Sequence, residues 1–250
     1  YTTEGWQGTV VAGGGITIES NPESEVAEAV WKAAALRRAC GWLSNDTKPM
    51  TKGELGIYPL YLEQQKFEIE EKFDLRVAFI DNLDSFSYAL QMFGCEVDVI
   101  DGRGEIIDFD HDAVVIGPGP GRPEISPVTM HAAKLEIPVL GICLGHQAIG
   151  LSRGMDLIES PYGPVHGVPS TIIANGSGLM EKGRYDMTRY NSLVLAGSGE
   201  LEVTASDETG SLPMEIRHGN TYGIQFHPES IGSQKGMLVL AEFLRRVAHA

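Results

Sequence analysis

A single cysteine stands between two glycines where an apolar run ends, in the segment VLGICLGHQAIG (139–150). A strand-to-helix turn of the form Gly-x-Cys-x-Gly presents a nucleophile at a helix N-terminus, because only glycine fits on either side of it. The helix dipole and the free N–H groups at that end favour the thiolate. Cys143 is therefore a candidate nucleophile, with the N–H of Leu144 as a candidate oxyanion donor. On the glycines alone, an inert core cysteine is an equal alternative.

A histidine and a glutamate near the other end of the chain would complete this chemistry. The segment YGIQFHPES (222–230) carries His227 at the end of an apolar run, and Glu229 follows it closely. A thiolate nucleophile needs a group that moves protons, and an imidazole needs a partner that fixes its tautomer. His227 and Glu229 are the candidates for these two roles. A further glycine-rich segment, GPGPG (117–121), also follows an apolar run, and its Gly119 is a candidate second oxyanion donor.

Short apolar runs alternate with helical stretches from Leu75 onward, which is typical of a parallel sheet covered on both faces. The predicted parallel strands are 75–80, 96–100, 113–116 and 138–142. The later runs indicate antiparallel hairpins, and they are 171–173, 201–203, 214–216 and 222–226. A closing helix is expected over 236–247. In open parallel sheets, sites form at the carboxyl ends of the strands, where Cys143 and the glycine-rich segments fall.

Composition limits the classes of partner. The chain has 250 residues, a hydrophobic content of 42% and a formal net charge of −15, which argues against nucleic acid and anionic membranes as partners. The three cysteines lie far apart, and no apolar run reaches the roughly 18 residues of a membrane helix, so we expect a reducing, cytoplasmic setting. We divide the chain into a segment of residues 1–40 with a helical stretch, a polar linker of 41–74 and an α/β domain of 75–250.

Four motifs in order, GPGPGRPE (117–124), CLGHQ (143–147), TRYNSL (188–193) and QFHPES (225–230), resemble those of the class I, or triad, glutamine amidotransferases. DNLDSF (81–86) is similar to the opening motif of the anthranilate and aminodeoxychorismate synthase branch of that family. The resemblance covers the whole predicted α/β domain. It implies an α/β fold with a mostly parallel central sheet and helices on both faces.

The resemblance also implies an activity, the hydrolysis of L-glutamine to glutamate and ammonia without a cofactor. Cys143 would attack the side-chain amide to form a γ-glutamyl thioester. His227, oriented by Glu229, would protonate the leaving ammonia and then activate water. The family pattern assigns the oxyanion N–H groups to Gly119 and Leu144. It assigns glutamine binding to Gly117, Pro118, Gly119, Gln147, Ser192 and Leu193.

The chain departs from the family pattern in several places. The family usually has RYHSL, with histidine where this chain has Asn191, and a lysine where this chain has Val168. The triad does not need the histidine of RYHSL, but its replacement could alter packing or coupling. The connections in 84–97 and 124–138 are short for full helices. Either these helices are trimmed, or residues between the segments are missing from the sequence.

Residues 12–33, AGGGITIESNPESEVAEAVWKA, resemble the carboxyl-terminal end of the chorismate-utilising domain of the same enzymes. There, a glycine turn binds a carboxylate of chorismate, and two glutamates one helical turn apart hold Mg²⁺, which prefers oxygen ligands. The resemblance assigns chorismate binding to Gly13, Gly14, Gly15 and Lys32, and metal binding to Glu25 and Glu28. We then expect the chain to be the carboxyl-terminal part of a longer fusion, which forms a homodimer through its synthase part.

Several functions remain open, and we place first a glutaminase that supplies ammonia to anthranilate synthase. The alternatives in the same class are aminodeoxychorismate synthase and a phenazine-type 2-amino-2-deoxyisochorismate synthase. The phenazine-type relative also has Asn in the RYHSL motif but departs from this chain at CLGHQ. A non-catalytic amidotransferase-like regulatory module is disfavoured by the intact Cys143, His227 and Glu229. A cysteine peptidase of similar fold is disfavoured by Gln147 and Ser192.

Overall fold

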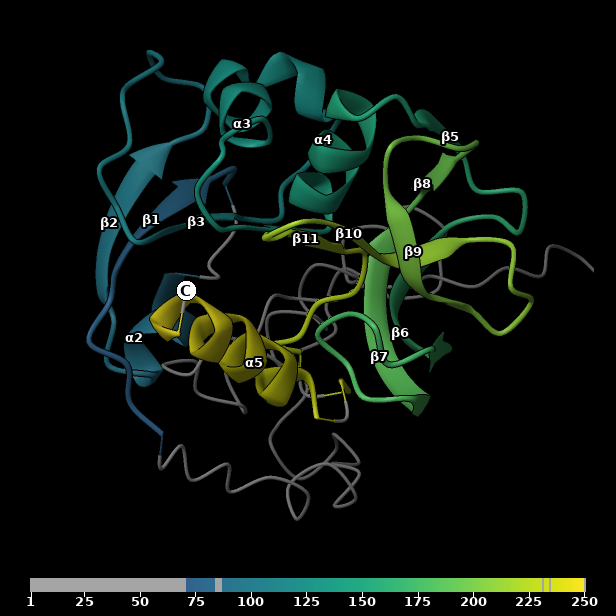
Figure 1. Ribbon diagram of the computed structural model, residues 1–250. Coiled ribbons are helices and arrows are strands. Elements are labelled where there is room, and N and C mark those ends of the chain that lie inside the picture. The colour runs from purple at the N-terminus through teal and green to yellow at the C-terminus, as the bar shows by residue number, and fades with distance from the viewer. Residues whose placement is uncertain (1–70, 84–86, 231, 234, 250) are drawn as a thin grey trace, which may run out of the picture. The chain divides into compact units, whose positions relative to one another are not determined.

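A nine-stranded sheet runs through the residues that the structure describes, with its strands in the order β2-β1-β3-β4-β11-β10-β9-β6-β7 (Figure 1). The structure is a computed structural model, which describes residues 71–83, 87–230, 232–233 and 235–249. Its strands are β1 (Arg76–Asp81), β2 (Glu96–Asp101), β3 (Ala113–Ile116), β4 (Val139–Ile142), β5 (Asp156–Glu159), β6 (Val165–Ala174), β7 (Gly183–Asn191), β8 (Leu193–Ala196), β9 (Glu202–Asp207), β10 (Pro213–His218) and β11 (Thr221–Ile224). β5 and β8 form a separate antiparallel pair.

The described helices are α2 (Ser87–Met92), α3 (Pro127–Ala132), α4 (Leu144–Ser152) and α5 (Gly236–Ala248), with a 3₁₀ turn at Pro123–Ile125. α2 and α3 have only 6 residues each. The two short connections noted in the sequence therefore hold short helices. The closing helix predicted over 236–247 is confirmed, with one further residue at its end.

Strand direction changes in the middle of the large sheet. β2, β1, β3, β4 and β11 are mutually parallel, whereas β10, β9, β6 and β7 continue the sheet in antiparallel pairs. The predicted parallel strands are confirmed. The prediction for 222–226 was wrong in one respect, because β11 is antiparallel to β10 on one side but parallel to β4 on the other. This strand joins the two halves, and its carboxyl end therefore lies beside that of β4.

Each face of the parallel half packs against helices. Figure 1 shows α3 and α4 on one face and α2 and α5 on the other. Successive residues of β3 point to opposite faces, as strand geometry requires. Ala113 and Val115 join the core beneath α2 and α5, and Val114 and Ile116 join the core beneath α3 and α4. Both faces are buried, which explains why the strand sequences are continuously apolar instead of alternating.

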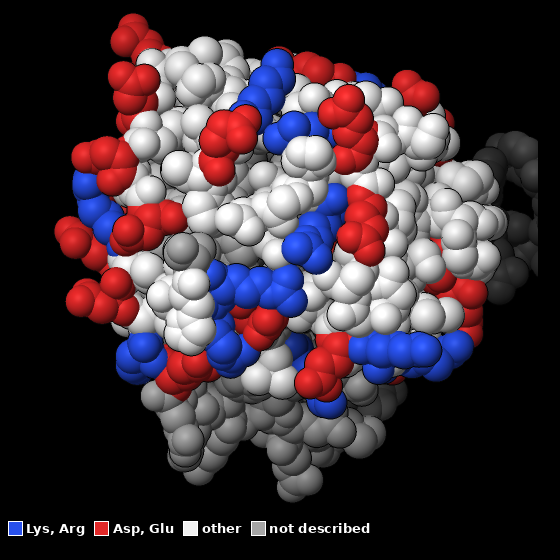
Figure 2. Space-filling view, viewed as in Figure 1, with Lys and Arg blue, Asp and Glu red and all other residues white. Residues whose placement is uncertain are grey.

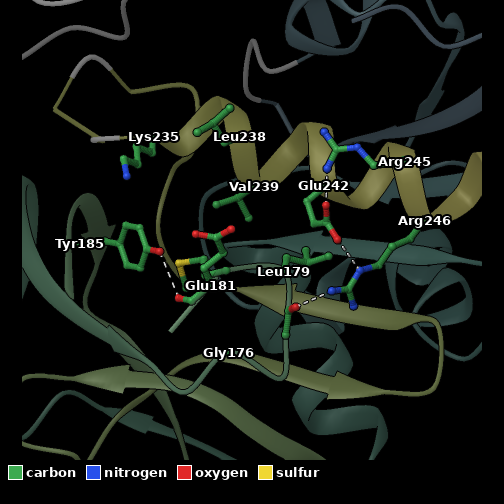
Figure 3. Close-up of a pocket in the computed structure, with 12 residues that line it drawn as sticks. Gly176, Leu179, Glu181, Tyr185, Lys235, Leu238, Val239, Glu242, Arg245 and Arg246 are labelled. Atoms are coloured by element: carbon green, nitrogen blue, oxygen red, sulfur yellow. Dashed lines mark hydrogen bonds and ion pairs between the residues drawn. The ribbon is translucent and has the colours of Figure 1, made fainter. Parts of the chain in front are cut away.

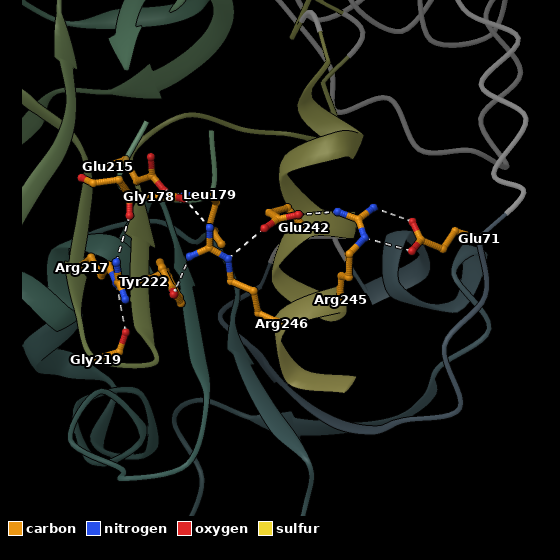
Figure 4. A network of polar contacts seen from close by, with 11 residues as sticks. Glu71, Gly178, Leu179, Glu215, Arg217, Gly219, Tyr222, Glu242, Arg245 and Arg246 are labelled. Atoms are coloured by element: carbon orange, nitrogen blue, oxygen red, sulfur yellow. Dashed lines mark hydrogen bonds and ion pairs between the residues drawn. The ribbon is translucent and has the colours of Figure 1, made fainter. Parts of the chain in front are cut away.

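A polar network ties α5 to its surroundings (Figure 4). Arg246 donates to Glu242 at 2.9 Å and to the hydroxyl of Tyr222, on β11, at 2.8 Å. Arg245 binds both carboxylate oxygens of Glu71, at 3.1 and 2.7 Å. Two-point pairing of this kind between guanidinium and carboxylate fixes geometry as well as adding attraction. α5 is thereby tied to the strand that leads to His227.

Charged side chains of both signs are interspersed over the face shown in Figure 2. Several form exposed ion pairs, among them Arg122 with Glu124 at 3.1 Å and Arg184 with Glu208 at 2.6 Å. On this face the basic side chains do not form the continuous stripe that nucleic-acid-binding proteins use. No described helix has the length and apolar character needed to cross a membrane.

Candidate active site at the ends of the parallel strands

Cys143 occupies the turn between β4 and α4. Its backbone has φ 52° and ψ −97°, and a positive φ is uncommon for any residue other than glycine. A Cβ atom on Gly141 would collide with Gly145, and one on Gly145 would collide with Ile116. Glycine is therefore a steric requirement on both sides of the turn. The predicted strand, tight turn and helix are confirmed, and strain of this kind is typical of functional positions.

His227 lies beside the nucleophile because β11 pairs with β4, with Ile224 opposite Ile142. The N–H of Cys143 donates to the carbonyl of Ile224 at 2.8 Å. His227 is buried, and its Nδ1 lies 2.7 Å from Oε1 of Glu229. Its other nitrogen, Nε2, is buried and has no hydrogen-bond partner among the described residues. The pair predicted from His-Pro-Glu is thus assembled, with one imidazole nitrogen held and the other left for chemistry.

Two opposing effects set the pKa of His227. Burial disfavours the charged imidazole and would lower the pKa. The carboxylate of Glu229 and the sulfur of Cys143 both favour the charged form, and together they hold the pKa of His227 well above its usual range. The environment therefore favours an imidazolium that can give its proton to a leaving group.

The imidazole ring is also held by packing. The ring of Tyr190 meets that of His227 edge-on, with a centroid distance of 4.8 Å and an angle of 72° between the planes. Edge-to-face pairs of this kind are favourable beyond the area they bury. Ser230 donates to the hydroxyl of Tyr190 at 3.2 Å and so anchors the outer end of that ring. Glu229 and Tyr190 therefore restrain the imidazole from two directions.

The glycine-rich segment after β3 is shaped by Asn82, which follows β1. The amide of Asn82 donates to the carbonyl of Gly117 at 3.2 Å and accepts from Thr129 at 2.9 Å. Gly119 packs so closely on Asn82 that a Cβ atom there would collide with it. Glycine is therefore a steric requirement at Gly119, whose role as an oxyanion donor stays a prediction. Leu144, the other candidate oxyanion donor, is the first residue of α4, where no preceding helical carbonyl can accept its N–H.

Two of the residues predicted to bind glutamine, Gln147 and Leu193, are in contact. Gln147, on α4, donates to the carbonyl of Leu193 at 3.1 Å. The hydroxyl of Ser192 lies 3.2 Å from Nε2 of His166, on β6. Asn191, which replaces the family histidine, is buried and donates to the same carbonyl of Leu193 at 3.0 Å. The structure therefore brings the CLGHQ and TRYNSL segments into direct contact.

Cys95, the other described cysteine, is not an alternative nucleophile. Burial raises the pKa of the Cys95 thiol to about 11, so at neutral pH it is protonated and unreactive. Cys40 lies outside the described residues. So do the positions predicted for chorismate and Mg²⁺, which are Gly13, Gly14, Gly15, Lys32, Glu25 and Glu28.

A cavity of about 330 Å³ lies elsewhere in the domain, between α5 and the loop before β7 (Figure 3). Its basic side chains already have partners. Lys235 lies over the ring of Tyr185 at 5.9 Å, and Arg245 and Arg246 both pair with Glu242. None of the predicted site residues lines this cavity. The cavity is therefore distinct from the predicted cysteine site.

The arrangement at the strand ends can carry out acyl transfer. It combines a strained cysteine at a helix N-terminus, a buried histidine paired with a carboxylate, and glycine-lined backbone where an oxyanion would form. These features define a class of α/β protein that carries a cysteine in a tight strand-to-helix turn (a cysteine elbow) and a His–Glu pair, both at the carboxyl ends of its parallel strands.

Comparison with known families identifies the chain. The profile of the family "Glutamine amidotransferase class-I" matches residues 78–247, and the chain belongs to this family. It is 38% identical over 187 residues to "Anthranilate synthase component 2" of Cyanophora paradoxa, covering 67% of this chain and 97% of that protein. It is 36% identical over 188 residues to "Aminodeoxychorismate synthase component 2" of Escherichia coli, covering 68% and 100%. The chain is thus an enzyme of the glutamine amidotransferase class.

The fold agrees with a solved structure. A glutamine amidotransferase of Thermotoga maritima superposes with a TM-score of 0.59 at 17% sequence identity, covering 70% of this chain and 99% of the other. At this identity the likeness concerns the fold alone. It confirms the predicted α/β fold class.

Sequence reasoning missed two buried polar residues at the site. Gln225 reaches Cys143, with its Nε2 3.6 Å from Sγ. Arg189 donates to Asn191 at 3.1 Å; burial lowers the pKa of Arg189, whereas the charges of Asp207 and Cys143 favour its charged form. Both residues belong to motifs quoted from the sequence. Their position within those motifs was the available signal, but nothing local shows which way a side chain points.

Proposed function

We propose that this protein hydrolyses L-glutamine to glutamate and ammonia through Cys143, His227 and Glu229. The observation that carries the proposal is the placement of a cysteine elbow beside a buried His–Glu pair with a contact of 2.7 Å. Membership of the class-I family supports glutamine as the substrate.

In the first half-reaction, the sulfur of Cys143 attacks the side-chain carbonyl carbon of glutamine. The negative charge that forms on the oxygen is stabilised by the N–H groups of Gly119 and Leu144. The C–N bond then breaks, and ammonia leaves with a proton from Nε2 of His227. A γ-glutamyl thioester and a neutral imidazole remain, with Glu229 still holding Nδ1.

In the second half-reaction, water takes the place of ammonia. The neutral imidazole of His227 removes a proton from water as its oxygen attacks the thioester carbon. The C–S bond breaks, the thiolate of Cys143 leaves, and the product is released as glutamate. The enzyme returns to its starting thiolate and imidazolium.

Glutamine binding is proposed for residues of the GPGPGRPE, CLGHQ and TRYNSL segments. They are Gly117, Pro118, Gly119, Gln147, Ser192 and Leu193. The contact of Gln147 with Leu193 at 3.1 Å supports a continuous pocket wall, because it joins α4 to the start of β8.

We further propose that the ammonia passes to a chorismate-aminating synthase, with anthranilate synthase first. The printed names of the relatives support this class and include both anthranilate and aminodeoxychorismate synthase components. A phenazine-type 2-amino-2-deoxyisochorismate synthase stays an alternative. The intact cysteine site argues against a purely regulatory module.

The proposed organisation assigns residues 1–40 to the end of a synthase domain, 41–74 to a linker and 75–250 to the glutaminase. Chorismate would contact Gly13, Gly14, Gly15 and Lys32. Glu25 and Glu28 would hold Mg²⁺, whose chemistry there is to bind carboxylate oxygens. A homodimer through the synthase part is proposed on the same resemblance.

The function is tested on the full-length protein with glutamine, chorismate and Mg²⁺. We expect glutamate, and pyruvate as the product of anthranilate formation. Cys143→Ala should abolish glutamine-dependent synthesis while ammonia-dependent synthesis survives. Retained glutamine-dependent activity would refute the nucleophile. Absence of pyruvate, with chorismate still consumed, would replace anthranilate synthase by one of the alternatives.

A further inference from the structure

Gln225 is a buried side chain beside the nucleophile that the reaction steps above do not use. Its exposed fraction is 0%, and its Nε2 lies 3.6 Å from Sγ of Cys143. Its Oε1 accepts a hydrogen bond from Nε2 of Gln147 at 3.3 Å. One amide therefore touches both the reacting sulfur and a residue of the proposed glutamine pocket.

An amide can present either its oxygen or its NH₂ group to the sulfur, and its neighbours decide which. The guanidinium of Arg189 can only donate, so Asn191 turns its Oδ1 toward it at 3.1 Å. Asn191 must then donate through Nδ2 to the carbonyl of Leu193, at 3.0 Å. A carbonyl can only accept, so Gln147 also turns Nε2 toward it, at 3.1 Å.

The direction of the Gln147 amide decides which group Gln225 turns toward the nucleophile. Because Gln147 presents its NH₂ group, Gln225 must present its oxygen to Gln147 and its own NH₂ group to Cys143. The sulfur is then an acceptor. A hydrogen bond is stronger when its acceptor is charged, so this contact favours the thiolate over the thiol.

We propose that Gln225 is a further catalytic residue, whose amide N–H holds the sulfur of Cys143 as a thiolate. The carbonyl of Leu193 orients the amide of Gln147, and the hydrogen bond from Gln147 to Oε1 of Gln225 then directs the N–H of Gln225 toward the sulfur. The inference rests on the proposed function for its use in glutamine hydrolysis. The contact acts when the sulfur is charged, before the first attack and again when the thiolate leaves the thioester.

The expected effect is about tenfold on the equilibrium between thiol and thiolate, which is one pH unit, since a hydrogen bond to a charged group at this long distance is at the weak end of its range. A less stabilised thiolate is also more nucleophilic, by about threefold for one unit. At pH values below the midpoint, where half of Cys143 is ionised, a variant without this N–H should therefore react about threefold more slowly with an alkylating reagent. Above that pH its rate should not fall. A merely structural residue would not move the midpoint.

The experiment measures alkylation of Cys143 by iodoacetamide against pH in the full chain, with the modified peptide identified by mass spectrometry. Gln225→Met removes the donor and keeps the volume. We expect its midpoint to rise by about one unit, and that of Gln225→Glu to rise further because a carboxylate repels the thiolate. Thr204→Val, a buried substitution on β9 outside the network, is the matched control and should keep the wild-type midpoint.

An unchanged midpoint in both Gln225 variants would overturn the proposal. If Gln225→Met does not fold, Gln225→Asn withdraws the N–H while keeping an amide, and the same upward shift is expected. Alkylation needs no glutamine, so its result is separate from that of the proposed function. A shift in a protein without glutaminase activity would refute only that function, and an active glutaminase without a shift would refute only the role of Gln225.

Discussion

Replacing Glu229 by glutamine tests how the His–Glu pair works. The carboxylate accepts the Nδ1 proton of His227 at 2.7 Å, and the imidazole side chain is almost fully buried. Glutamine has nearly the same shape and can still accept that proton through its amide oxygen. Glu229→Gln therefore removes the negative charge while leaving the tautomer and the position of the ring in place.

The magnitude follows from the kind of bond that is lost. A hydrogen bond to a charged group contributes about 1.5–3 kcal/mol, against about 0.5–1.5 kcal/mol for a neutral one. The difference of about 1–1.5 kcal/mol corresponds to roughly tenfold in kcat. Glu229→Ala also releases the ring, so its loss should be larger, on the order of a hundredfold or more.

The pKa of His227 supplies a second measurement. Without the charge of Glu229, the pKa of His227 should fall, because burial disfavours the charged imidazole and only the sulfur of Cys143 still favours it. In the wild type the folded pKa is raised, so the stability that this histidine adds is complete below pH about 6.5 and is lost as pH rises through the raised value. Glu229→Gln should weaken this pH dependence of unfolding.

Two assays decide the outcome: glutamate release from glutamine across pH, and NMR titration of the His227 imidazole. Wild-type kcat in Glu229→Gln, together with an unmoved titration of His227, would refute the electrostatic role of the carboxylate. A loss as large as that of Glu229→Ala would show instead that glutamine fails to hold the tautomer.

Three further predictions concern stability, measured by urea unfolding. Cys143→Gly should be more stable than Cys143→Ala by about 1 kcal/mol, because glycine relieves the positive φ of 52°; equal stabilities would mean that the turn is unstrained. Gly145→Ala should cost about 2 kcal/mol or more and abolish glutaminase activity, since the new Cβ collides with Ile116, and a variant of wild-type stability would contradict that contact. Burial lowers the pKa of His146 to about 4, so stability should be complete above pH about 6.5 and fall by about 3 kcal/mol as pH drops to 4. His146→Gln should lose most of this slope, and an unchanged slope would place its origin elsewhere.

Much of the site could be predicted from short segments of the sequence. A glycine is needed wherever a side chain would collide within a turn. Gly141 and Gly145 therefore predict the tight strand-to-helix turn at Cys143 without knowledge of the fold. The pairing of His227 with Glu229 is also local, because the two are separated by a single proline. Continuous apolar runs predicted the parallel strands, since a strand buried on both faces has no polar side.

The pairing of strands that lie far apart in the sequence could not be predicted in this way. The sequence of 222–226 suits either strand direction, and only packing against β4 made β11 parallel there and brought His227 to Cys143. The contact between Asn82 and the segment before Gly119 likewise joins residues far apart in the chain.

The sequence by itself determined which residues are chemically able to act, because residue type and the sterics of short segments are local properties. Only the tertiary structure decided how they act together. The direction of the Gln225 amide depends on Gln147, which donates both to the carbonyl of Leu193 and to Oε1 of Gln225. Such an orientation arises from hydrogen bonds between separate elements, so it exists only after those elements have packed.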